Sequence, residues 1–231
     1  AALLGGGTDN ILPGEISLAH NGVLFMDEFC EMPKRVMEAL RGPMEDRKVT
    51  ISRLKSKVEY PADFMLIAAT NPCPCGYYGH PTRKCTCSPQ TVQKYLSRIS
   101  GPLMERFDMH LEVEPVLFEE LSDTKKPESS EEIRKRVKNA RAIQERRYKG
   151  TGITCNAQIP AGHLQTYCPV TDDARKVIQD AFDKLGLSAR SYDRILKVAR
   201  TIADTSGAEV IGKSHAAAAI QYGSLNWKYK V

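Results

Sequence analysis

Long apolar stretches are missing from this sequence of 231 residues. No run approaches the ~20 consecutive apolar residues that a membrane-spanning helix needs. The opening residues, AALLGGGTDN, lack the basic segment with which a secretory signal peptide begins. Without an export signal, the seven cysteines do not indicate a secreted disulfide framework. We therefore expect a cytoplasmic protein with no membrane partner, and the net charge of +5 is too small by itself to predict a nucleic-acid partner.

Two short apolar runs end in polar side chains that suit a nucleotide site. Val23–Met26 (VLFM) precedes Asp27 and Glu28, and Phe64–Thr70 (FMLIAAT) precedes Asn71. Such runs are typical of buried strands in a parallel sheet, whose carboxyl ends bind ligands. There, one carboxylate orders Mg²⁺ on a nucleotide, the next polarises the attacking water, and an amide on a neighbouring strand orients the water or the γ-phosphate. The alternative is that both strands simply end in surface residues.

Residues 1–115 alternate short strands with helices. The apolar spacing predicts a helix through Val36, Met37 and Leu40, which Gly42-Pro43 ends. The other predicted elements are a hairpin with strands Lys48–Arg53 and Lys57–Tyr60, a helix that starts at Ser88-Pro89 and breaks at Ser100-Gly101-Pro102, and a strand at Met109–Val113.

Residues 116–127 are interpreted as a linker, and the chain from about residue 128 onward is helical. Ser129 and Glu132 have capping-box spacing. The fold class is therefore α/β: a parallel sheet with helices and an inserted β-hairpin in residues 1–115, then an all-helical domain in residues 128–231. Four helices are predicted there. The first has an apolar stripe of Ile133, Val137, Ala140 and Ile143, and the second covers residues 174–185 and stops at Gly186. The third and fourth span Ala189–Asp204 and Ser214–Asn226.

Four of the seven cysteines gather in one loop. Cys73-x-Cys75 and Cys85-x-Cys87 flank residues 76–84, a segment with two glycines and a proline. Four thiolates close a tetrahedral Zn²⁺ shell, so we predict a structural zinc site. His80 in the same loop is a candidate to replace one sulfur, and reduced thiols or disulfides are the alternatives. The scattered Cys30, Cys155 and Cys168 are expected to be ordinary buried residues.

Basic residues cluster on and around the predicted hairpin: Arg47, Lys48, Arg53, Lys55 and Lys57. Such a set binds nucleic-acid phosphates without sequence preference. A charged hairpin also serves simply to keep a sheet edge soluble, and charge alone does not decide between the two.

Two further arginines are candidates for contact with phosphate. Arg106 would either stay in its own core or reach a neighbouring subunit's nucleotide as an arginine finger. Arg190 falls in the first turn of the helix predicted from Ala189, with Arg194 and Lys197 on the same face. That cationic face is either solvated or suited to a lid that contacts phosphate.

Four stretches resemble the AAA+ ATPases of the magnesium-chelatase-like group, and within it the ComM/YifB type: PGEISLAHNGVLFMDE, AATNPCPCG, YLSRISGPLMERFD and LSARSYDRILKVARTIAD. They occur in order over nearly the whole chain. The resemblance implies a partial AAA+ core and a helical lid, with ATP and Mg²⁺ as ligands. It implies that Asp27 and Glu28 are Walker B, Asn71 sensor 1, Arg106 the arginine finger and Arg190 the sensor 2 arginine.

The resemblance also implies a ring, taken here as a hexamer, with the hairpin of residues 48–60 facing its pore. Arg53, Lys55 and Lys57 would then contact DNA. Such ATPases have a phosphate loop, G-x-x-x-x-G-K-[ST], before Walker B, and residues 1–21 contain none. The match at Gly207–Ser214 (GAEVIGKS) follows a predicted helix instead of a strand, so we interpret it as a turn. We expect the phosphate loop to precede this sequence in a longer protein, and these residues alone not to hydrolyse ATP.

Three functions are consistent with these patterns. The first is a ring-forming, Mg-dependent ATPase that acts as a motor on DNA, as in competence- or recombination-related branch migration. The second is a magnesium-chelatase-type motor that drives metal insertion into a porphyrin, a family whose corresponding segment lacks the four cysteines. The third is a zinc-stabilised nucleic-acid-binding module without ATPase activity, which the placement of the acids, Asn71 and the arginines disfavours.

Overall fold

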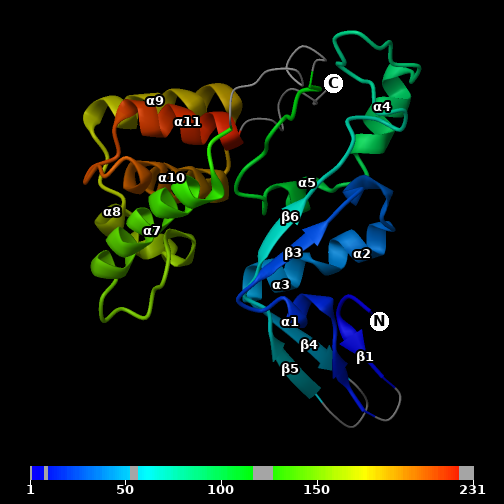
Figure 1. The fold of residues 1–231 in the computed structure, drawn as a ribbon, viewed down its shortest axis with the longest axis horizontal. Helices are drawn as coiled ribbons and strands as arrows, with labels where there is room; N and C mark the ends of the chain where they lie inside the picture. Colours follow the sequence, from blue (N-terminus) through cyan, green and yellow to red (C-terminus); the bar gives the residue numbers. More distant parts are fainter. Residues whose placement is uncertain (1, 8–9, 53–56, 117–126, 224–231) are drawn as a thin grey trace. The chain divides into compact units, whose positions relative to one another are not determined.

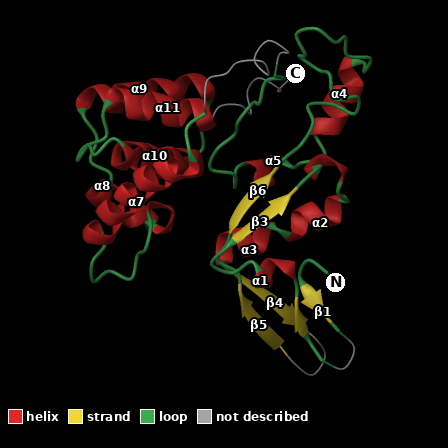
Figure 2. Cartoon of the chain, in the orientation of Figure 1, coloured by secondary structure: helices red, strands yellow, loops and turns green. Residues whose placement is uncertain are grey.

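The computed structural model describes residues 2–7, 10–52, 57–116 and 127–223 (Figure 1). These residues group into two units, one that runs to Phe107 and one that begins at Asp108. The first unit mixes strands and helices, whereas the second is built from helices (Figure 2). This confirms the coarse expectation of an α/β part followed by a helical part. Within the described ranges, no helix has both the length and the apolar character needed to cross a bilayer.

Two parallel strands lie at the centre of the first unit. Strand β3 (Val23–Met26) pairs in parallel with β6 (Met65–Ala68), so that Val23 lies opposite Met65. The pairing confirms that the two apolar runs form neighbouring parallel strands. Parallel neighbours require a long crossover connection, and residues 27–64 provide it with short helices and the hairpin.

Only one face of this strand pair is buried. Met26 lies on the inner face, but side chains on the outer face are exposed, from 45% for Ile67 to 62% for Met65. The expectation of fully buried strands is therefore wrong for the described residues. Side chains alternate between the two faces of a sheet, and nothing in the described part of the chain covers the outer one. The inner core consists of Ile16, Met26, Phe29, Met37, Leu40, Val49, Ala62 and Leu103.

Short helices flank β3 on both sides in the sequence. Gly42-Pro43 does not end the helical segment as expected, because it lies in the first turn of a further helix, where a proline sacrifices no hydrogen bond. The elements are the antiparallel pair β1 (Gly5–Gly6) and β2 (Leu12–Pro13), α1 (Glu15–Leu18), the 3-10 helix η1 (Phe29–Glu31), α2 (Lys34–Ala39) and α3 (Arg41–Asp46).

The predicted hairpin is confirmed. Strands β4 (Lys48–Ser52) and β5 (Lys57–Pro61) pair antiparallel, with Thr50 opposite Glu59. Val49 on the inner face is 3% exposed, so the hairpin is anchored to the core of the unit by its apolar side. Residues 53–56, which include Arg53 and Lys55, lie outside the described residues.

Helices α4 (Pro89–Leu96) and α5 (Gly101–Met104) each begin with a serine cap followed closely by a proline. The Oγ atoms of Ser88 and Ser100 accept backbone N–H groups three residues on, at 3.2 and 3.4 Å. The predicted helix start at Ser88-Pro89 is confirmed. The segment expected only to break that helix also begins the next one, because a serine cap and a first-turn proline favour a helix start.

The strand expected at Met109–Val113 is absent from the described structure. The segment has no partner strand among the described residues, and its apolar side chains are exposed, from 45% for Met109 to 88% for Val113, whereas His110 is half-buried. A backbone bond from the N–H of His110 to the carbonyl of Tyr222, at 2.8 Å, ties it to the second unit's last helix. Alternation of apolar residues was therefore not enough, because a strand also needs an edge to pair with.

Helix α7 (Ser130–Arg147) opens the helical part of the second unit with the predicted capping box. The Oγ of Ser129 accepts the N–H of Glu132 at 3.3 Å, and the Glu132 carboxylate accepts the N–H of Ser129 at 2.9 Å. The expected apolar stripe packs only toward its end: Ala140 is 5% exposed, whereas Val137 is 52% exposed. Residues 117–126 lie outside the described residues, so the linker stays a prediction.

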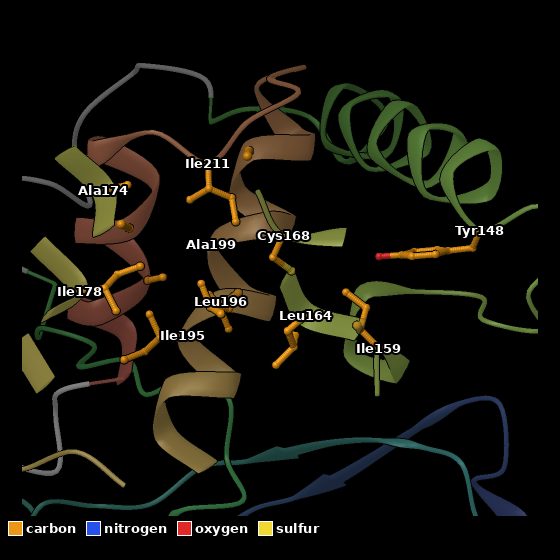
Figure 3. Close-up of a cluster of buried hydrophobic side chains, with 14 residues drawn as sticks. Tyr148, Ile159, Leu164, Cys168, Ala174, Ile178, Ile195, Leu196, Ala199 and Ile211 are labelled. Atoms are coloured by element: carbon orange, nitrogen blue, oxygen red, sulfur yellow. The ribbon is translucent and has the colours of Figure 1, made fainter. Parts of the chain in front are cut away.

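Helix α10 forms the core of the second unit. Its residues Ile195, Leu196 and Ala199 lie among apolar side chains from the neighbouring helices (Figure 3). Gly186, at φ 57°, ends α9 as predicted. The helices are η2 (Asn156–Gln158), η3 (Ala161–His163), α8 (Leu164–Tyr167), α9 (Asp172–Leu185), α10 (Ala189–Thr205) and α11 (Lys213–Gly223); residues 224–231 lie outside the described residues.

Helix α10 also buries charged side chains. Arg200 is 1% and Asp204 2% exposed. The Asp204 carboxylate accepts hydrogen bonds from Arg200 Nε at 3.1 Å, Asn156 Nδ2 at 2.8 Å and Arg147 Nη1 at 2.8 Å. Buried charges are tolerated when they are paired and hydrogen-bonded, and this cluster joins η2, α7 and α10.

Candidate functional site

The carboxyl ends of β3 and β6 meet at one edge of the sheet. The N–H of Ala69 donates to the carbonyl of Met26 at 2.9 Å, so the pairing continues past the strand ends. Asp27 and Glu28 follow β3 at this edge, Asn71 follows β6, and all three residues are exposed. The strands that these residues follow are therefore neighbours, as predicted, and the roles of the three side chains stay predictions.

Glu28 interrupts the regular ladder at this edge. In a regular parallel pair, the carbonyl of Ala69 would accept the N–H of Glu28. Instead the N–H of Phe29 donates to it at 2.8 Å, and the N–H of Glu28 donates to Asp27 Oδ1, also at 2.8 Å. The chain therefore contains one extra residue here, which is a bulge.

The backbone of Glu28 is strained. Its φ of 48° and ψ of 42° lie in the left-handed region, which costs a residue with a side chain about 1–2 kcal/mol. Such outliers persist only where surrounding structure enforces them, and they cluster at functional sites. Here the strained residue is the second acid of the predicted Walker B pair.

Arg106 is held within its own unit. Its guanidinium donates to the carbonyl of Pro102 at 2.6 Å and forms an ion pair with Glu45 of α3, and its side chain is 12% exposed. Of the two alternatives drawn from the sequence, this structure therefore has the one in which Arg106 stays in its own core. Its action on a neighbouring subunit stays a prediction.

The basic residues of α10 do not share one environment. Arg190 lies in the first turn and is exposed, whereas Arg194 is only 7% exposed. Lys197 donates to the carbonyl of Ala157 at 3.2 Å. Burial raises the pKa of Asp108 above its usual range, and the charges of Arg194 and Lys197 oppose that rise. Arg194 is therefore not on a solvated face, and a contact of these residues with phosphate stays a prediction.

The four loop cysteines converge. The Sγ of Cys73 lies 3.4 Å from that of Cys75 and 3.8 Å from that of Cys85, and the sulfurs of Cys75 and Cys85 lie 3.5 Å apart. With Cys87 included, all four sulfurs lie within 4.8 Å of one another. Sulfurs about 2.3 Å from a tetrahedral zinc ion are about 3.8 Å from each other. The donor set and its spacing therefore fit the predicted metal.

Backbone N–H groups polarise these sulfurs. Hydrogen bonds from the N–H groups of Tyr77 and Thr86 lower the pKa of Cys75 to about 5. The N–H of Cys87 donates to Cys85 Sγ at 3.4 Å, but burial and the neighbouring sulfurs outweigh it and raise the pKa of Cys85 to about 12. All four thiols can therefore be deprotonated at the same time only if a cation is bound between them.

The remaining metal and thiol expectations are partly corrected. Nδ1 of His80 accepts the N–H groups of Thr82 and Arg83 at 3.2 and 3.1 Å, so His80 caps a turn and does not replace a sulfur. Cys30 and Cys168 are buried as expected, and burial raises the pKa of both thiols. Cys155, which directly precedes η2, is only half-buried, contrary to expectation.

Acids offset the described cations of the hairpin. Glu59 pairs with Lys48 at 3.1 Å and with Lys57 at 3.4 Å, and Asp63 pairs with Arg47 at 3.7 Å. Exposed pairs of this kind contribute little to stability. They therefore leave these cations able to exchange a carboxylate for a phosphate.

Residues 207–212 of the phosphate-loop match form the connection between α10 and α11, as interpreted from the sequence, and Lys213 and Ser214 begin α11. The carbonyls of Ala208 and Glu209 accept hydrogen bonds from the buried guanidinium of Arg200, at 2.7 Å for Glu209. A phosphate loop presents its N–H groups to an anion. Because this turn presents carbonyls to a cation, it is not a nucleotide site.

Two features near the site escape the sequence reasoning. The pairing of Arg106 with Glu45 joins residues far apart in the chain and leaves no sequence signal. The second was readable: residues 72–104 contain no aspartate or glutamate. A local charge count finds this stretch, whose basic residues are Arg83, Lys84, Lys94 and Arg98.

Comparisons with known proteins cover nearly the whole chain. Residues 1–121 match the family model described as magnesium chelatase, subunit ChlI, and residues 127–223 match the model of its C-terminal part. The chain is 42% identical over 228 residues to the Salmonella typhimurium protein YifB, over 97% of this chain and 43% of the relative. It is also 42% identical over 225 residues to the competence protein ComM of Haemophilus influenzae, with the same shares.

A more distant relative is the DNA replication licensing factor mcm6 of Dictyostelium discoideum. It is 27% identical over 203 residues, which is 88% of this chain and 20% of that protein. The chain thus spans less than half the length of each of these three relatives.

Proposed function

This chain belongs to the magnesium chelatase ChlI family, as a protein of the ComM/YifB type, and from that premise we propose that the intact protein is an AAA+ ATPase. One observation supports the proposal above all. Asp27, Glu28 and Asn71 lie at the carboxyl edge of two neighbouring parallel strands, where open α/β sheets bind ligands.

The residues at this edge fit a magnesium nucleotide. Carboxylate and amide oxygens are the hard donors that Mg²⁺ prefers, and Asp27 and Glu28 are exposed to receive it. The hydrogen bond from Glu28 N–H to Asp27 Oδ1 fixes one oxygen of Asp27 and leaves the other for the metal. Mg²⁺ held there would neutralise charge on the nucleotide phosphates. Glu28 would take a proton from the attacking water, and Asn71 would orient that water or the γ-phosphate.

The arginines supply the remaining charge. We propose that Arg106 contacts the nucleotide of a neighbouring copy in a ring, which we take as a hexamer, and that Arg190 contacts phosphate from the helical lid. To reach a neighbour, Arg106 must leave Glu45, and the partly exposed carboxylate of that pair makes this exchange feasible. The phosphate loop is assigned to a segment of the intact protein outside the 231 residues.

The proposed substrate of the motor is DNA. Two of the matched relatives are named as a competence protein and as a DNA replication licensing factor. The hairpin β4–β5 presents Lys48 and Lys57 at its surface, and Arg53 and Lys55 fall between its two strands in the sequence, outside the described residues. The alternative of a motor for metal insertion into a porphyrin rests on the family's name. The basic hairpin and the four-cysteine loop favour DNA over it.

The substitution Glu28→Gln in the intact protein tests the ATPase proposal. It keeps the side-chain shape but removes the base, so kcat for MgATP should fall by about 10²-fold or more while ATP binding persists. The control is Glu31→Gln, three residues on, whose carboxylate pairs with Arg98 at 3.4 Å instead of lying at the strand end. That variant should keep kcat within about threefold.

Steady-state phosphate release gives kcat, and equilibrium binding of a labelled nucleotide gives the affinity. An unchanged kcat in Glu28→Gln would remove this residue from its proposed role. Equal losses in both variants would point to a general disturbance of the segment around η1.

A further inference from the structure

The cysteine loop is organised around its four sulfurs. Gly76, at φ 81°, closes a turn in which its N–H donates to the carbonyl of Cys73 at 3.0 Å. That turn brings Cys75 back beside Cys73, with the two sulfurs 3.4 Å apart. The second pair returns after residues 76–84 and places Cys85 within 3.8 Å of Cys73 and 3.5 Å of Cys75.

The rest of the loop folds through bonds that do not involve sulfur. Arg83 Nη1 donates to the Tyr77 hydroxyl at 2.8 Å and its guanidinium lies over that ring, 5.3 Å from the centroid. His80 caps the intervening turn through Nδ1. Tyr77, His80 and Arg83 are therefore engaged with neighbouring groups of the loop, and the four sulfurs lie within 4.8 Å of one another.

The surroundings suit a negatively charged metal–thiolate centre. Four thiolates around a divalent cation have a net charge of −2. Backbone N–H groups of the loop point at sulfur, as Cys87 N–H does to Cys85 Sγ at 3.4 Å. The whole segment of residues 72–104 lacks acidic side chains, and it contains four basic ones. Both features lower the electrostatic cost of such a centre.

Four soft thiolate donors at tetrahedral spacing select zinc or iron among the common metals, and a closed shell leaves no open position for chemistry. We propose that Cys73, Cys75, Cys85 and Cys87 hold one structural Zn²⁺, and that this ion fixes the segment between Asn71 and helix α4. The first and last ligands lie close in sequence to the elements that the ion would fix. Cys73 follows Asn71 by two residues, and Cys87 directly precedes the Ser88 cap of α4. The site stands on its own geometry and does not depend on ATPase activity.

Metal content of the 231-residue chain tests the site directly. Protein purified without chelator should contain about one zinc per chain by elemental analysis. The variants Cys75→Ser and Cys87→Ser should each lose most of it, whereas Cys155→Ser, a half-buried cysteine outside the loop, should keep it. Iron in place of zinc, zinc well below one per chain, or a full zinc content in the loop variants would overturn the proposal.

A second measurement covers the case in which a serine variant fails to fold. In the wild-type chain, a mercurial reagent that titrates thiols should release zinc in step with four cysteines, and Co²⁺ replacement should produce sulfur-to-cobalt charge-transfer absorption. Hydrogen exchange after zinc removal should accelerate in residues 72–88 by about tenfold or more and stay unchanged in residues 127–223. Absence of the cobalt band, or unchanged exchange in residues 72–88, would contradict the assignment.

Discussion

Asp204 is the residue on which we expect the helical unit to depend most. Its carboxylate forms ion pairs with two guanidinium groups, those of Arg147 and of the almost fully buried Arg200. Asp204→Asn preserves the shape of the side chain but removes its charge. It also places an amide NH₂ group, a hydrogen-bond donor, against the N–H donors that the carboxylate now accepts. Breaking a buried pair in this way costs about 3–5 kcal/mol, because a charge is left buried and uncompensated.

The predicted loss of stability is large enough to be measured for the helical unit separately. Each 1.4 kcal/mol changes an equilibrium about tenfold, so a loss of 3 kcal/mol speeds exchange of the most protected amides of α10 by about 10²-fold or more. Hydrogen exchange read out by mass spectrometry reports this for the helical unit alone. The control is Asp180→Asn on the exposed side of α9, which should change stability by less than about 0.5 kcal/mol.

The same carboxylate gives the unit a pH dependence. Burial raises the pKa of Asp204, but hydrogen bonds from Arg147 and Asn156 and the charge of Arg200 outweigh it, so the pKa lies below its usual range. Its stabilisation is therefore complete above the unfolded value of about 3.9 and is lost as the pH falls through the lower folded value. Asp204→Asn should abolish this acid sensitivity. A loss below about 1 kcal/mol at neutral pH would refute the view that the cluster is held by charge.

Two further predictions concern the first unit. Glu28→Gly should raise the free energy of unfolding by about 1 kcal/mol, because glycine relieves the left-handed strain, while Glu28→Gln changes it by less than about 0.5 kcal/mol. Urea unfolding monitored by hydrogen exchange measures both, and a destabilised glycine variant would show that the backbone there is unstrained. In the intact protein, Lys55→Glu with Lys57→Glu should weaken DNA binding and reduce the slope of log affinity against log salt by about 2. The control reverses Lys135 and Lys138 on α7, and equal affinities in all three proteins would exclude the hairpin as a DNA contact.

Local chemistry explains the predictions that were confirmed. The capping box of Ser129 and Glu132, the stop at Gly186 and the serine cap at Ser88 each depend on bonds between residues a few positions apart. Such signals are complete within the sequence. Where a partner was needed, sequence reasoning failed: the alternating residues of Met109–Val113 have no strand to pair with in the described structure.

Residue identity and spacing, which are local properties, were enough to name the candidate site residues and most of the helices and strands, although not the conformation of residues 109–113. The fold was needed to establish that β3 and β6 pair, that the four sulfurs lie within 4.8 Å of one another, and that Arg106 lies against Glu45. It also decided the left-handed backbone of Glu28, since the ladder bond from Phe29 to Ala69 enforces a conformation that glutamate disfavours by itself. These features depend on contacts between residues separated in the chain. Local patterns suggested the strand pairing and the cysteine cluster, but not the ion pair of Arg106 or the backbone of Glu28.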